Sequence, residues 1–175
     1  MSDSEAGPVP QHAVIVGVIP DQPPRVLKEA ARYAQLFGAP LIVAHVDVTR
    51  FVTYEDPDGY VHSAPIDLDI AVGEAQLASV TAAAASVLDG TGVDWSVRQL
   101  VGDPALAIKQ LAEQSQARLI VVGTRRRGFG ESIREFFTGS VAARLAHRQS
   151  RPVLVVPLEE PAADDEPLWP HDDAG

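Results

Sequence analysis

The sequence predicts a single α/β domain built on a doubly wound parallel β-sheet. Short apolar runs rich in β-branched residues alternate with segments of helical periodicity, which is the pattern of strands joined by crossover helices. Most of these runs are continuously apolar, as expected for strands covered on both faces, and right-handed crossovers then give the doubly wound form. The five runs are 12–18, 40–46, 95–101, 118–123 and 152–157.

Helical patterns fill the spaces between the runs. Residues 24–37 repeat apolar side chains every three or four positions, and Gly38 provides a C-terminal stop. A second helix is predicted over 70–88, ending at Asp89-Gly90.

The later helices carry clearer end signals. The third spans 103–114, with Asp103 as its N-cap and Pro104 at the first helical position. The fourth begins near Ser140 and ends around His147 and Arg148. The resulting order is β-α-β-α-β-α-β-α-β, with no internal repeat.

Three segments lie outside this rhythm. We expect residues 1–11 to be disordered and 12–158 to form the domain. Within it, 49–69 is a polar insertion, longer than ordinary connections, which suggests a functional flap or a mobile loop. The tail 159–175 is acidic and rich in Pro and Ala, so we expect it to be disordered. It serves either solubility or a contact with a cluster of arginines upstream.

Composition excludes several classes of function. The 175 residues contain no cysteine, which removes disulfides, thiolate metal sites and cysteine nucleophiles. The net charge of −10 argues against general binding to nucleic acid or anionic membrane. The sequence shows no secretory signal and no run of about 20 apolar residues, so a cytoplasmic location is expected.

Charge is nonetheless unevenly distributed. The tail beyond Leu158 contains acidic residues and neither Lys nor Arg. Half of the 14 basic residues gather upstream, which favours an anionic ligand there. They are Arg125, Arg126, Arg127, Arg134, Arg144, Arg148 and Arg151.

The segment after the fourth run is the strongest candidate site. Ligands of open α/β sheets bind at the carboxyl ends of strands where the strand order reverses, here between 12–18 and 118–123 if these are neighbours. Glycines would let backbone N–H groups approach a phosphate, and Ser140 opens a helix whose N-terminus favours negative charge. A solvated surface loop is the alternative. The glycines are Gly123, Gly128, Gly130 and Gly139.

At this segment the chain resembles the universal stress protein family. Residues 121–125, 139–142 and 151–157 are similar to the C-terminal signature of that family. Residues 101–104 and 41–46 are similar to its earlier segments, and the resemblance covers about 13–158 in order.

The resemblance implies an adenine nucleotide alpha hydrolase-like fold with sheet order 3-2-1-4-5. It implies a homodimer formed through the last strand, 152–157. It also implies a bound adenine nucleotide, ATP or another, with Mg²⁺ left open. By correspondence with the family, the nucleotide site comprises Gly17, Val18, Ile19, Val46, Val122, Gly123, Arg125, Arg126, Gly128, Gly130, Gly139, Ser140 and Val141.

Two departures touch that site. Ile19 stands where the first strand of binding members ends in Asp, with Asp21 two residues on. Arg126 replaces the second glycine of the loop, which is three residues longer than usual between Gly123 and Gly139. The alternative function is therefore a nucleotide-independent, dimeric module that contacts another protein.

A dedicated enzyme is not expected, because the sequence contains no nucleophile elbow and no lysine-bearing phosphate loop. His45 lies in an apolar strand and is interpreted as a core histidine, and the histidines show no metal-ligand spacing. Slow hydrolysis of a bound nucleotide stays open as a third hypothesis.

Overall fold

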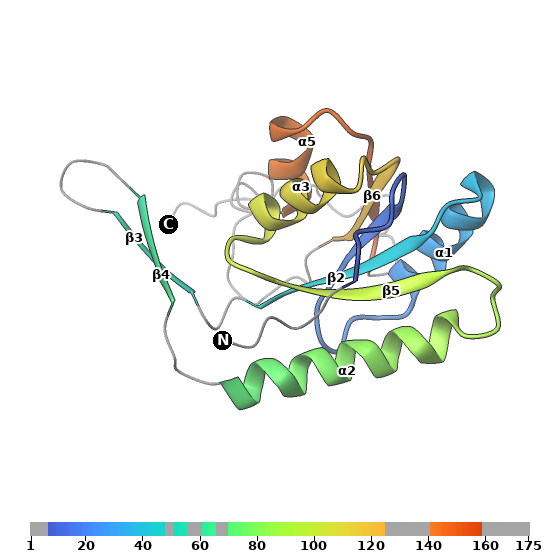
Figure 1. Cartoon of the computed structure of the whole chain (residues 1–175), viewed down its shortest axis with the longest axis horizontal. Helices are drawn as coiled ribbons and strands as arrows, with labels where there is room; N and C mark the ends of the chain where they lie inside the picture. Colours follow the sequence, from blue (N-terminus) through green and yellow to red (C-terminus); the bar gives the residue numbers. More distant parts are fainter. Residues whose placement is uncertain (1–6, 48–50, 56–60, 66–69, 125–140, 159–175) are drawn as a thin grey trace, which may run out of the picture.

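The computed structural model describes residues 7–47, 51–55, 61–65, 70–124 and 141–158. The main elements alternate along the chain, as the apolar pattern predicts (Figure 1). They are β1 (Val14–Val18), α1 (Arg25–Phe37), β2 (Leu41–Asp47), β3 (Phe51–Glu55), β4 (Val61–Pro65), α2 (Ile70–Leu88), β5 (Trp95–Val101), α3 (Pro104–Gln114), β6 (Leu119–Gly123), α5 (Val141–Arg148) and β7 (Val153–Val156).

The main sheet has five parallel strands in the order β5-β2-β1-β6-β7. Counted along the main sheet this is 3-2-1-4-5, so the expected fold is confirmed. β1 lies at the centre and pairs with β2 on one side and β6 on the other. The strand order therefore reverses between β1 and β6.

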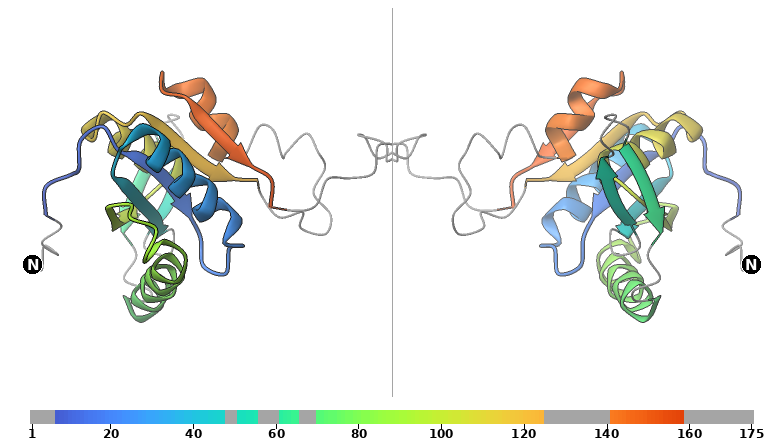
Figure 2. Two further views of the ribbon diagram at one scale, coloured as in Figure 1. Left: turned by 90° about the vertical axis from the view of Figure 1, so that its right-hand side faces the viewer. Right: turned by 90° about the vertical axis from the view of Figure 1, so that its left-hand side faces the viewer.

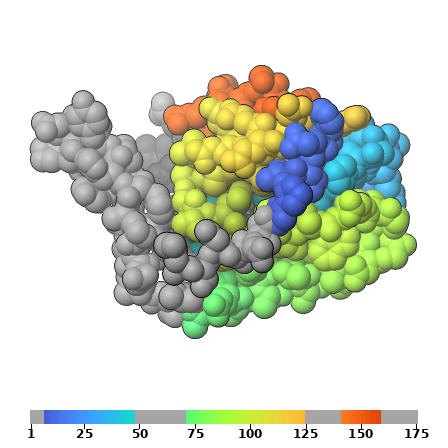
Figure 3. All heavy atoms as spheres, viewed as in Figure 1, coloured from blue at the N-terminus to red at the C-terminus, as the bar shows by residue number. Residues whose placement is uncertain are grey.

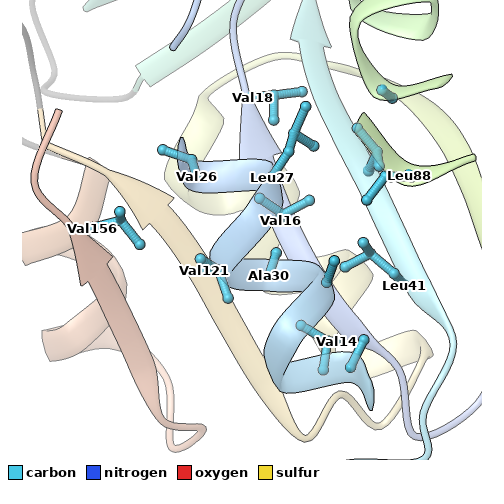
Figure 4. Packing of buried hydrophobic residues seen from close by; sticks show 14 of the residues in the cluster. Val14, Val16, Val18, Val26, Leu27, Ala30, Leu41, Leu88, Val121 and Val156 are labelled. Atoms are coloured by element: carbon cyan, nitrogen blue, oxygen red, sulfur yellow. The ribbon is translucent and has the colours of Figure 1, made fainter. Parts of the chain in front are cut away.

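Helices cover both faces of this sheet (Figure 2). Alternate side chains of β1 and β2 pack with α1 and α2 on one face, where Val14, Val16 and Leu41 are fully buried. Figure 4 shows α1 lying across β1 on this face. The opposite side chains, including Ile15 and Ile42, pack against α3 and α5.

The helix ends follow the local signals of the sequence. Gly38 ends α1 in the left-handed region, with φ 56°, and its N–H is bonded back to the last turn. Asp103 caps α3 by accepting a hydrogen bond of 2.9 Å from the backbone N–H of Leu106. Pro104 occupies the first turn, as predicted.

The insertion 49–69 differs from the long loop expected. It contains β3 and β4, which pair antiparallel as a separate two-stranded sheet. Polar and aromatic residues dominate this segment, so its strands lack the continuous apolar runs that identify strands of the main sheet.

Residues 7–11, expected to be disordered, are held against the domain. Gln11 Nε2 donates to the carbonyl oxygen of Gln114 at 3.1 Å, and Val9 packs on the core beside α3. The guanidinium of Arg98, on β5, donates to the carbonyl oxygens of Gly7 and Pro8. In Figure 3 this N-terminal stretch lies beside α3 on the surface of the molecule.

Within the described residues, one helix is long and apolar enough to cross a membrane by length and composition alone, over Ala71–Leu88. Its apolar character comes largely from small residues such as alanine. Val80, Ala84 and Leu88 of this helix pack into the core on the α1 side of the sheet. α2 is therefore a covering layer of the α/β domain.

Candidate functional site

The carboxyl ends of β1 and β6 lie side by side. Gly17 is the register partner of Val122, and Gly123 ends β6 one residue later. This is the position at which the strand order reverses and where open α/β sheets bind ligands. The structure thus confirms the adjacency on which the predicted site depends.

The predicted site residues of the described chain separate onto the two faces of the sheet. Val46, Val122 and Val141 pack with the cluster beside α3 and α5. Val18 packs with the cluster beside α1. These residues therefore lie on both faces of the sheet at its carboxyl edge and do not form a single surface.

Gly17 is required by close packing. A Cβ at this position would lie 3.0 Å from Ile108 Cδ1 of α3 and 3.4 Å from Val122 Cγ1. The absence of a side chain lets α3 approach the end of β1. A side chain at this position would therefore disturb the packing of α3 on the sheet at Ile108.

Ile19 follows β1 and is 62% exposed. Its backbone N–H donates to Gln22 Oε1 at 3.0 Å, which closes the turn between β1 and α1. The amide nitrogen of the same Gln22 side chain lies 2.7 Å from where a Cβ of Gly123 would stand. Gln22 therefore joins the two strand ends, a role that the sequence analysis missed.

Leu158 contacts the same space beside Gly123 as Gln22 does. Its Cδ2 lies 3.0 Å from the position of a Cβ on Gly123, and its N–H donates to Thr124 Oγ1 at 3.0 Å. Thr124 N–H in turn donates to the carbonyl oxygen of Val156 at 2.9 Å. The chain that leaves β7 is thereby fixed at the end of β6.

Arg144, one of the arginines expected to favour an anionic ligand, is already paired with an acidic side chain. Its guanidinium forms a bidentate pair with Asp103, with Nη1 2.6 Å from Oδ2 and Nη2 2.8 Å from Oδ1. Partial burial raises the pKa of the Asp103 carboxyl, but hydrogen bonds from Arg144 and from the Leu106 N–H lower it by more, so the net pKa lies below the usual value. The pair fastens the N-terminus of α3 to α5.

A buried polar group lies at the end of β2. His45 is 2% exposed, and its Nδ1 is 3.3 Å from the carbonyl oxygen of Val18. Its Nε2 has no hydrogen-bond partner among the described residues. Only one nitrogen of this core histidine is thus satisfied there.

Much of the predicted phosphate-binding loop lies outside the described residues. This applies to Arg125, Arg126, Gly128, Gly130, Gly139 and Ser140. In the part of the chain that the structure does describe, no group of three or more His, Asp or Glu residues could hold a metal ion.

A small hollow adjoins the site on the α1 side. It has a volume of about 90 Å³ and lies between the turn after β1, the start of α1 and the middle of α2. Sites for drug-sized ligands are usually roughly 300–1,000 Å³, so this hollow cannot hold a whole nucleotide.

A family model, that of the universal stress protein family, matches residues 12–157. A universal stress protein structure from Archaeoglobus fulgidus is 22% identical, with a TM-score of 0.62 over 84% of this chain and 94% of that one. A universal stress protein in complex with cAMP is 26% identical, with a TM-score of 0.56 over 86% of this chain and 99% of that one. A family protein from Burkholderia pseudomallei is 24% identical, with a TM-score of 0.53 over 83% and 96%. The comparison with curated proteins returns no match.

Proposed function

The chain belongs to the universal stress protein family, and from this premise we propose that it binds an adenine nucleotide at the carboxyl ends of β1 and β6. The observation that carries the proposal is the reversal of strand order at this edge. Gly17 of β1 pairs there with Val122 of β6, and Gly123 is the next residue of β6. The structure crystallised with cAMP adds support, because it resembles this chain over most of both lengths.

The proposed roles follow the two halves of a nucleotide. The adenine and ribose are held by Val18, Ile19 and Val46, at the ends of the first two strands. Backbone N–H groups of Gly123, Gly139 and Ser140 bind the phosphates, because amides near a helix N-terminus attract anions. The remaining loop contacts, together with Mg²⁺ as a companion of ATP, are also proposals. They involve Arg125, Arg126, Gly128, Gly130 and Val141.

Gln22 and Leu158 determine how the site opens. Both side chains contact the space beside Gly123, so a phosphate group on that side requires their displacement. Gln22 is partly exposed and its amide sits at the end of a flexible side chain, so its displacement costs mainly the 3.0 Å hydrogen bond from the Ile19 N–H. A net hydrogen bond is worth about 0.5–1.5 kcal/mol, which a nucleotide can replace.

Thermal unfolding with and without nucleotide tests the proposal. At a nucleotide concentration 100 times the dissociation constant, linkage stabilises the protein by about 2.7 kcal/mol. For a chain of this size that raises the midpoint of unfolding by about 5–11 °C. ATP, AMP and cAMP are compared, each with Mg²⁺ and with EDTA. An unchanged midpoint with all three at millimolar concentration removes the proposal.

Ile19→Asp tests where the nucleotide binds. An acid at the end of β1 restores the group that binding members of the family carry, so the variant is expected to bind nucleotide more tightly. Leu36→Asp is the matched control, because Leu36 is 68% exposed on the last turn of α1, away from the strand ends. Equal affinities in both variants argue against a site at Ile19.

A nucleotide-independent interaction module is the second candidate. Ile19 at the end of β1 and the covering of Gly123 by Gln22 and Leu158 favour it.

We also propose that the chain dimerises through β7, the edge strand on which Val155 is 43% exposed. Dimers in sedimentation that form equally with and without nucleotide, combined with no thermal shift, support this candidate.

The proposed role is binding rather than catalysis. Slow hydrolysis of a bound nucleotide is tested by phosphate release from ATP. A rate that the double variant Arg125→Ala, Ser140→Ala does not lower excludes hydrolysis at this site.

A further inference from the structure

The hollow beside the β1–α1 turn is open, mainly apolar and lined by three separate parts of the fold. Ile19 and Pro20 form its rim, and Val26 comes from the first turn of α1. Ser79 and Ala83 of α2 form the facing wall. Figure 4 shows Val18 and Leu27, two further lining residues, close together at the end of α1 that adjoins it. At about 90 Å³ it has the size of a docking site for one large apolar side chain.

The last described residue brings the C-terminal segment to this hollow. Leu158 and Gln22 both contact the space beside Gly123, and Gln22 also lines the hollow. The N–H of Leu158 is held by Thr124 Oγ1, so the chain that follows starts from a fixed point next to the rim. The starting point of the tail is therefore set by the structure.

The tail carries one apolar group suited to the hollow. After the acidic residues that follow Leu158, the sequence Pro167-Leu168-Trp169-Pro170 is neutral and apolar. The chain from Leu158 to Trp169 reaches at most about 36 Å when fully extended, at roughly 3.3 Å per residue, which is ample for a hollow adjoining its origin. A short tether also gives a local concentration on the order of millimolar, so a weak apolar contact is well populated.

Charge favours the same path. Arg25 and Lys28 are exposed on the first two turns of α1, next to the hollow, and neither forms an ion pair with another described residue. The tail between Leu158 and Pro167 carries five acidic residues in this chain: Glu159, Glu160, Asp164, Asp165 and Glu166. Asp21 is the acid on the rim of the hollow, where the neutral Leu168-Trp169 pair would enter.

We propose that the hollow between the β1–α1 turn and α2 is the docking site of the chain's own Leu168-Trp169 segment. The acidic stretch before it crosses the basic start of α1, and an apolar side chain of the pair enters between Ile19 and Ala83. Ile19 and Gln22 border both this hollow and the proposed nucleotide site, so the docking is tested without nucleotide.

Tryptophan fluorescence of the full chain tests the docking. The sequence has two tryptophans, so Trp95→Phe leaves Trp169 as the sole reporter. We expect its emission maximum at a shorter wavelength, and its quenching by acrylamide weaker, than in a peptide of residues 159–175. Adding Ala83→Glu blocks the wall and should move both values to those of the peptide. Ala82→Glu is the matched control, because Ala82 is an exposed neighbour on α2 that does not line the hollow.

Leu168→Ser gives a second arm that leaves the folded domain unaltered. It should move the Trp169 emission toward that of the peptide carrying the same change. The proposal is overturned if Trp169 in the full chain matches the peptide, or if Ala83→Glu and Ala82→Glu behave alike while far-ultraviolet circular dichroism shows both folded. A blue shift that disappears on dilution indicates docking into a second copy and also overturns it.

Discussion

Removal of the Asp103 carboxylate should weaken the packing of α3 on α5. The carboxylate accepts one bond from the Leu106 N–H and two from the Arg144 guanidinium. Asp103→Ala removes all three, whereas Asp103→Ser keeps a side-chain oxygen for the N-cap and loses the ion pair. Arg144→Met keeps an apolar stem and loses only the charged fork.

The magnitude follows from two separate contributions. Loss of an N-cap costs about 1 kcal/mol. The ion pair is partly exposed, at 34% for the Asp103 side chain and 30% for Arg144, so solvent screening limits it to about 0.5–1 kcal/mol. Asp103→Ala should thus lower the free energy of unfolding by about 1.5–2 kcal/mol and the midpoint of thermal unfolding by about 3–8 °C.

Urea unfolding followed by circular dichroism measures each contribution. Asp103→Ser and Arg144→Met should each cost less than Asp103→Ala. The double variant Asp103→Ser, Arg144→Met should cost less than the sum of its two single variants, because the second change removes an interaction already lost. Strict additivity would refute the ion pair, and equal losses in Asp103→Ser and Asp103→Ala would refute the cap.

The same carboxylate gives a pH dependence of defined sign. Its folded-state pKa lies below the ordinary value of 3.8, so the unfolded chain binds the proton more readily. Its contribution to stability is therefore complete above about pH 4 and is lost as the pH falls through the folded-state pKa. Asp103→Asn should show a smaller loss of stability in this acid range than the unmodified protein, measured by urea unfolding at each pH.

Further predictions concern the packing and the sheet edge. Gly17→Ala should lower the free energy of unfolding by about 1–3 kcal/mol, because the new Cβ meets Ile108 Cδ1 at 3.0 Å. Gly7→Ala is the control, since a Cβ there has no heavy atom within 4 Å and urea unfolding should not change. Equal effects of the two changes contradict the packing argument. Leu145 lies between α5 and the sheet and is 1% exposed. In the same assay, Leu145→Ala should lower the free energy of unfolding by about 2–5 kcal/mol, and a smaller decrease contradicts its burial. Val155→Lys should convert a β7-mediated dimer to monomers in sedimentation while the monomer keeps its circular dichroism spectrum; a dimer that persists places the interface elsewhere.

The main elements of the fold could be predicted because their signals are local. β1 and the first four residues of β2 form continuous apolar runs because both faces of each strand are covered, and these runs can be read before any contact is known. The N-cap of α3 likewise follows from Asp103 and Pro104 alone. The insertion was harder, because β3 and β4 pair with each other and lack the apolar runs of the central strands.

The candidate site could be predicted only in part, because the ion pair of Arg144 and the position of Gln22 depend on tertiary contacts. Nothing in the local sequence indicates that Arg144 would be held by Asp103 rather than remain in the arginine cluster. Gln22 appears ordinary in a polar turn, yet its amide lies between the ends of β1 and β6. Val18 and Val122, by contrast, follow from the strand ends and the family pattern, and the structure places them at that edge.

The central place of β1 also governs the order in which the chain can fold. One register partner of Val14, Leu41, is near in sequence, but the other, Leu119, lies most of the chain's length away. A nascent chain that still lacks β6 therefore exposes one hydrogen-bonding edge of its central strand to other chains. Late-forming, distant strand pairs slow folding and raise the risk of aggregation. For β1, we expect that vulnerable period to end once β6 has left the ribosome and paired with it.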